Sequence, residues 1–127
     1  MKNSTPDLQN PKAVSLFGPA LASAVSGWIL HGDLEGWTRR TIEDRRDWMR
    51  RMQAFLNARD MGFDVDGMRL FFHALTRGDA AAGCTRKLSP ASVKHVHAIV
   101  KAFGGWCVRE DLIAANPMLR IPAPILR

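Results

Sequence analysis

The sequence of 127 residues predicts an all-α domain, an orthogonal bundle of four helices with extended tails. Apolar residues recur at the three- and four-residue spacing of a buried helix face in four segments. No alternating strand pattern and no internal repeat is present. The apolar fraction of 46% is sufficient for one domain with a hydrophobic core.

The first two helices are expected to lie within residues 19–58. Proline suits the first helical turn, so the first helix should begin near Pro19, and Gly32 is a natural stop. Thr38 can cap the second helix, which should run to about Ala58. The apolar face of the first helix consists of Phe17, Leu21, Ala24, Val25, Trp28 and Ile29.

One charge, Arg45, interrupts the apolar stripe of the second helix. The opposite face of this helix mixes acidic and basic side chains at the spacing that allows pairing along a helix. The acids Glu43 and Asp47 are therefore interpreted as members of a solvated, salt-bridged face.

The last two helices have recognisable ends. Asp64 or Asp66 is expected to cap a third helix of about eleven residues, which Gly78 ends. The fourth helix has the clearest start in the chain, with Ser89 as N-cap and Pro90 at the first helical position.

Composition divides the chain into three parts. Residues 1–13 hold prolines and small polar groups and are interpreted as a flexible tail. The helical domain is assigned to residues 14–116. Residues 117–127 contain three prolines and are interpreted as an extended linker.

No catalytic, metal or cofactor site is predicted. The chain has no tyrosine and no phosphate-binding glycine loop, and its cysteines, Cys84 and Cys107, are interpreted as reduced thiols. His95 and His97 are two residues apart on a helix and point in roughly opposite directions, which argues against a shared metal. The pair Gly104 and Gly105 indicates a close helix crossing or a slight bend.

The charge balance favours an anionic partner. The chain carries 18 Lys and Arg against 12 Asp and Glu, a formal net charge of +6. Nucleic acid is the first partner to consider for such a chain. With no apolar signal segment and no span-length apolar run, a soluble cytoplasmic protein is expected.

Two segments together resemble a known module. These are GWTRRTIEDRRDWMRRMQAFL and LSPASVKHVHAIVKAFGGWCVREDLIAANPM, and their order and shared ending are similar to the N-terminal core-binding domain of tyrosine recombinases of the phage-integrase or Xer-like family. The resemblance implies a SAM-like helical bundle that clamps duplex DNA while a separate catalytic domain performs strand exchange. Neither the arginine motif nor the tyrosine nucleophile of that domain is present here. The chain is therefore expected to bind DNA without cutting it, in a bacterial or phage-encoded, nucleoid-associated protein.

Candidate DNA contacts gather at two helix starts, where phosphates find cations, hydroxyls and backbone N–H groups. In the family, the positions matching Arg40, Thr41, Ser92 and His95 contact DNA. The family often has an aromatic residue where Arg45 stands, and an arginine there can instead reach phosphate. The full set of candidates is Arg39, Arg40, Thr41, Arg45, Arg86, Lys87, Ser89, Ser92, Lys94 and His95.

The expected partners are duplex DNA, contacted mostly at phosphates, and other recombinase protomers on that DNA. No membrane and no small-molecule substrate is expected. Two alternatives remain open at this point: a helical protein–protein interaction module whose charge serves solubility or an acidic partner, and a nuclease that uses the acids of the second helix.

Overall fold

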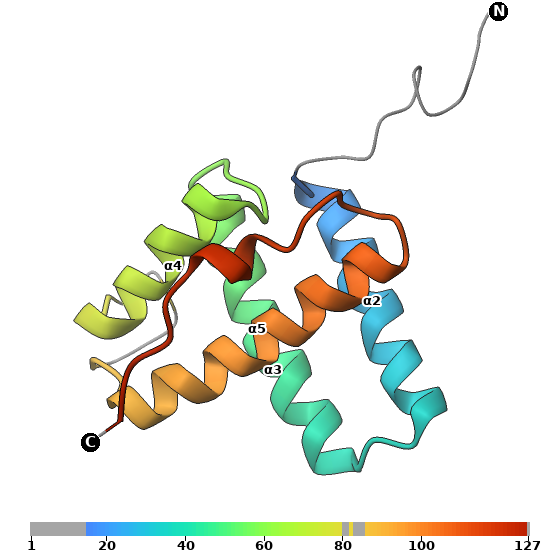
Figure 1. The fold of residues 1–127 in the computed structure, drawn as a ribbon, viewed down its shortest axis with the longest axis horizontal. Helices are drawn as coiled ribbons and strands as arrows, with labels where there is room; N and C mark the ends of the chain where they lie inside the picture. The colour runs from blue at the N-terminus through green and yellow to red at the C-terminus, as the bar shows by residue number, and fades with distance from the viewer. Residues whose placement is uncertain (1–14, 80–81, 83–85, 127) are drawn as a thin grey trace, which may run out of the picture.

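The computed structural model describes residues 15–79, 82 and 86–126, and these form an all-helical bundle. Within this part of the chain there is no β-strand, only an isolated bridge between Leu16 and Phe63. Figure 1 shows α5 crossing α3, with α4 to one side of the crossing and α2 to the other. The prediction of a four-helix all-α fold is confirmed. The elements are α2 (Gly18–Glu35), α3 (Arg39–Ala58), α4 (Val65–Arg77), α5 (Pro90–Arg109) and a short 3-10 helix, η2 (Pro117–Arg120).

Three of the helices begin at capping residues that the sequence identifies. The side chains of Thr38, Asp64 and Ser89 each accept a hydrogen bond from the backbone N–H three residues further on, at 3.2, 2.8 and 3.2 Å. Each bond satisfies one of the N–H groups that lack a partner in the first turn of a helix. Asp64 rather than Asp66 is the cap of α4, and Gly78 ends that helix in a left-handed conformation.

The first helix ends later than expected. α2 continues through Gly32 and stops at Gly36, whose φ of 89° allows the left-handed turn that closes it. Gly32 has a different role, because a Cβ at this position would overlap the ring of Trp37. The glycine is therefore a packing residue, and the prediction that it ends the helix is wrong.

Aromatic residues fill the space where the helices meet. Trp28 of α2 packs edge-on against Phe103 of α5 with ring centroids 5.5 Å apart, and Phe63 lies 5.1 Å from the same ring. Trp106 is also buried, whereas Trp48 is half-buried. The tryptophans are therefore mainly core residues rather than platforms for base stacking.

The segment after α5 folds back onto the bundle. Pro117, Met118 and Ile121 are buried, and Nε2 of His97 donates a hydrogen bond to the backbone oxygen of Ile121 at 2.7 Å. Residues 117–127 were expected to form an extended linker, but residues 117–121 pack onto the core of the bundle. The tail expected at residues 1–13 lies outside the described residues.

The two glycines of α5 differ in surroundings. A Cβ at Gly104 would overlap Oδ1 and Cγ of Asn116, whereas one at Gly105 would find its nearest atom, Nη1 of Arg109, at 3.6 Å. The close approach predicted for this pair exists at Gly104, and it admits an asparagine side chain rather than another helix.

Candidate nucleic-acid interface

Four polar residues from two helices line one hollow of about 320 Å³, here called the α3–α5 hollow. Arg40, Thr41 and Asp44 come from the first turns of α3, and His95 comes from the second turn of α5. The crossing of the two helices brings His95 Nε2 to 2.7 Å from Asp44 Oδ2, although the residues are 51 positions apart. Three of the predicted DNA contacts are therefore neighbours in space.

A second hollow of about 650 Å³, the α5 N-terminal hollow, holds four more of the predicted contacts: Arg86, Lys87, Ser89 and Ser92. Its position is fixed from one side by the hydrogen bond, 3.1 Å long, between the backbone N–H of Leu88 and the backbone oxygen of Leu75. This bond holds the end of the preceding loop against α4. The basic side chains therefore stand at the N-terminal end of α5, where the helix dipole also favours an anion.

Two predicted contacts stand outside both hollows and are exposed. Nε of Arg39 lies 3.0 Å from Oε2 of Glu43, in a pair whose arginine side chain is 90% exposed. Such a surface pair is worth little in water, so the guanidinium can exchange its carboxylate for a phosphate at small cost. Lys94 is exposed on α5, next to His95.

Arg45, a predicted phosphate contact, packs against two aromatic rings. Its guanidinium lies over the ring of Trp37, 4.3 Å from the centroid, and 5.2 Å from that of Trp28. Burial lowers the pKa of this guanidinium, and the nearby Asp44 partly offsets the effect. The charge that interrupts the apolar stripe is thus accommodated by cation–π contacts, and the structure gives it a packing role between α2 and α3.

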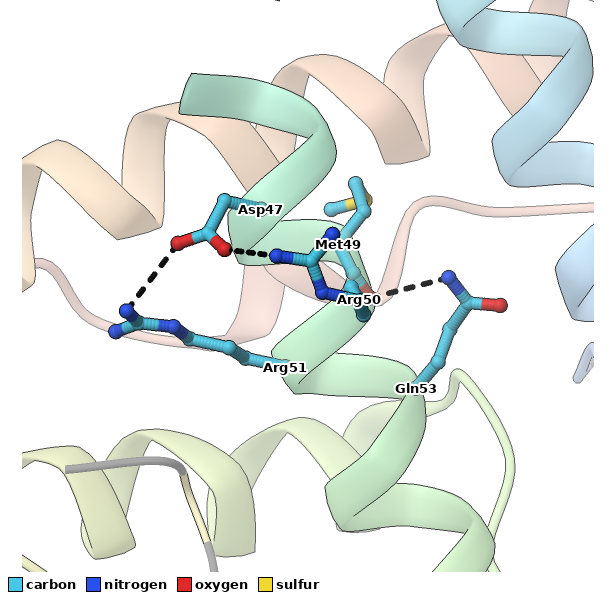
Figure 2. Close-up of polar contacts among 5 residues, drawn as sticks. All are labelled: Asp47, Met49, Arg50, Arg51 and Gln53. Atoms are coloured by element: carbon cyan, nitrogen blue, oxygen red, sulfur yellow. Dashed lines mark hydrogen bonds and ion pairs between the residues drawn. The ribbon is translucent and has the colours of Figure 1, made fainter. Parts of the chain in front are cut away.

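Two of the acids of α3, Glu43 and Asp47, are paired with arginines. Figure 2 shows Asp47 between Arg50 and Arg51, with Nη2 of Arg51 3.2 Å from Oδ2 of the aspartate. The interpretation of a salt-bridged face is confirmed for this residue and for Glu43. In the described part of the chain no three histidine, cysteine or acidic residues are grouped so that they could hold a metal ion.

Asp44 is the residue of the hollow that sequence reasoning did not assign. The spacing of 51 residues to His95 carries no signal, because the pair depends on the angle at which α5 crosses α3. Cys107 is a free, fully buried cysteine, and burial raises the pKa of its thiol to about 12. Cys84 lies outside the described residues.

Comparison of the chain with protein-family models, with curated proteins and with solved structures finds no match. Among the described helices, none is both long and apolar enough to cross a membrane. The case for a function therefore depends on the geometry of the two hollows and on the charge of the chain.

Proposed function

We propose that this chain binds duplex DNA, mainly through its phosphates, with the residues of the α3–α5 hollow and the α5 N-terminal hollow, together called the proposed face. The single observation that carries the proposal is the meeting of Arg40 and Thr41 with His95 in one hollow, from segments more than fifty residues apart. The sequence resemblance selects these same residues. In this proposal the chain is a core-binding domain of the tyrosine-recombinase type, and strand exchange belongs to a separate catalytic domain.

The chemistry of the face suits a phosphate backbone. The exposed cations are Arg40, Arg86 and Lys87 of the face and Lys94, which is next to His95. The hydroxyl groups of Ser89 and Ser92 line the second hollow together with Arg86 and Lys87. Phosphate contacts of this kind orient a protein on DNA without reading sequence. Affinity that comes from them falls steeply with salt, because each contact releases condensed counterions.

The test is a fluorescence-anisotropy titration of a labelled duplex of about 30 base pairs, between about 50 and about 200 mM salt. The double variant Arg40→Ala/Lys87→Ala removes one cation from each hollow. Two lost phosphate contacts should lower the slope of log affinity against log salt by about two. The affinity at the lowest salt should fall by roughly tenfold or more.

A matched control distinguishes binding by the residues of this face from attraction by net charge alone. Arg109→Ala/Arg120→Ala also removes two exposed cations, but neither residue lines a hollow that contains a predicted contact. This variant should keep the wild-type slope. Equal losses in the two double variants would mean that only net charge matters, and the proposed face would then be wrong.

A protein-interaction module remains the second candidate, because α2 exposes apolar side chains. Leu30 is 60% exposed and Leu34 is 82% exposed, and Leu30 borders a hollow of about 590 Å³ between α2 and α3. Self-association or partner binding at this surface would resist salt, in contrast to phosphate binding. Leu34→Asp would weaken such an association and leave DNA affinity unchanged, so the same titration distinguishes the two candidates. Contact between protomers on DNA would make both activities compatible.

A further inference from the structure

An acid–base pair lies inside the proposed phosphate site. His95 Nε2 and Asp44 Oδ2 are 2.7 Å apart, and their side chains are 57% and 39% exposed, so an incoming phosphate can reach both. The charged groups that line the hollow with His95 are Arg40 and Asp44 of α3, and Lys94 precedes His95 on α5. A phosphate that enters the hollow thus meets a carboxylate as well as cations.

We propose that phosphate binding in the α3–α5 hollow is coupled to uptake of one proton at His95. The inference rests on the proposed function and deepens it. With a neutral imidazole, Asp44 faces the phosphate as an uncompensated negative charge. With an imidazolium, one cation stands between two anions and attracts both. The complex therefore favours the protonated ring, and the proton comes from solvent.

The sign of the pH dependence follows from this coupling. Bound phosphate favours the protonated ring, so the complex binds more protons than the free protein over the range in which histidine titrates. Affinity for DNA should therefore be higher at about pH 6 than at about pH 8. Asp44 acts here as a positioning residue, because its carboxylate holds the His95 ring across the helix crossing. Its negative charge also makes phosphate binding sensitive to whether that ring is protonated.

The test compares dissociation constants for the same duplex at about pH 6 and about pH 8 at constant ionic strength. The wild-type chain should bind about fivefold more tightly at the lower pH, the effect of one exposed charge pair. His95→Gln should remove this ratio while the remaining cations still bind DNA. His31→Gln is the matched control, because His31 pairs with Glu35 at 3.3 Å on α2, outside the hollow, and should keep the wild-type ratio.

Asp44→Asn gives the independent readout. Removing the carboxylate should raise affinity by roughly two- to fivefold at both pH values, because its negative charge repels the phosphate whether or not His95 is protonated. If His95→Gln keeps the wild-type ratio, or if Asp44→Asn does not bind more tightly at the higher pH, the coupling is wrong although DNA binding stands. If the wild-type chain binds the duplex at neither pH, the proposed function itself fails. Circular dichroism at both pH values confirms that each variant is folded.

Discussion

The two adjacent glycines of α5 should respond in opposite directions to the same substitution. Gly104→Ala places a Cβ where Asn116 now lies, overlapping Oδ1 and 2.6 Å from Cγ. Asn116 cannot stay there, and it makes two hydrogen bonds of 3.0 Å: Nδ2 donates to the backbone oxygen of Lys101, and Oδ1 accepts from the backbone N–H of Met118.

The magnitude follows from these contacts. Two lost hydrogen bonds cost about 2 kcal/mol, and a buried Met118 N–H without a partner costs about 1 kcal/mol more. Alanine in a helix interior is favoured over glycine by about 1 kcal/mol, which offsets part of the loss. Gly104→Ala should therefore lower the free energy of unfolding by about 2 kcal/mol. Gly105→Ala meets only ordinary contacts at 3.6 and 4.0 Å and should raise it by up to about 1 kcal/mol.

Urea and thermal denaturation of the two variants measure these values, and each kcal/mol should move the melting temperature by about 3–5 °C. A double-mutant cycle then tests the cause. In an Asn116→Ala background the overlap is absent, so Gly104→Ala should be stabilising there. If Gly104→Ala is as stable as Gly105→Ala, or stays destabilising without Asn116, the assigned contact is not the reason.

Two further predictions concern Cys107 and Arg45. With Cys84→Ser removing the other thiol, Cys107 should resist iodoacetamide in the folded protein near pH 8, because its pKa is raised to about 12; rapid labelling without unfolding would contradict its burial. Above the ordinary thiol pKa of 9.0 the unfolded chain loses the Cys107 proton, whereas the folded state keeps it. The free energy of unfolding should therefore fall as the pH rises from 9.0 toward about 12. Alkaline denaturation of Cys107→Ala and of wild type measures this loss. Arg45→Ala should lower the free energy of unfolding by about 1 kcal/mol through loss of the contact with Trp37. The variant should leave the slope of log affinity against log salt unchanged. A slope lower by about one would instead indicate that Arg45 contacts a phosphate.

The helices were predictable where the deciding signal is local. The caps at Thr38 and Ser89 act within one turn, so the residue type and its position are sufficient to predict where these helices start. For α4 the same signal left two candidates, and the structure selects Asp64 over Asp66. The end of α2 was missed because tertiary packing decides it. A Cβ at Gly32 would overlap the ring of Trp37, so this glycine is required for packing. Gly36 adopts the left-handed conformation that ends the helix.

The candidate interface was predictable in its residue types but not in its internal contacts. The clustering of cations and hydroxyls at two helix starts is visible in the sequence, and the structure brings Thr41 and His95 into one hollow. The partner of His95 depends on how α5 crosses α3, which no spacing encodes. The position of Arg45 depends on two tryptophans that approach from α2 and the following turn, so its cation–π role could not be predicted from the helical stripe.

The most direct test of the central claim is a map of amide chemical shifts in the ¹⁵N-labelled chain as a duplex is added at low salt. The largest changes are expected at residues 39–44 and 86–95, which include the predicted contacts of both hollows, and these changes should reverse when salt is raised. Changes confined to α2 around Leu30 and Leu34, or no changes with a folded protein, would contradict the proposed DNA-binding face.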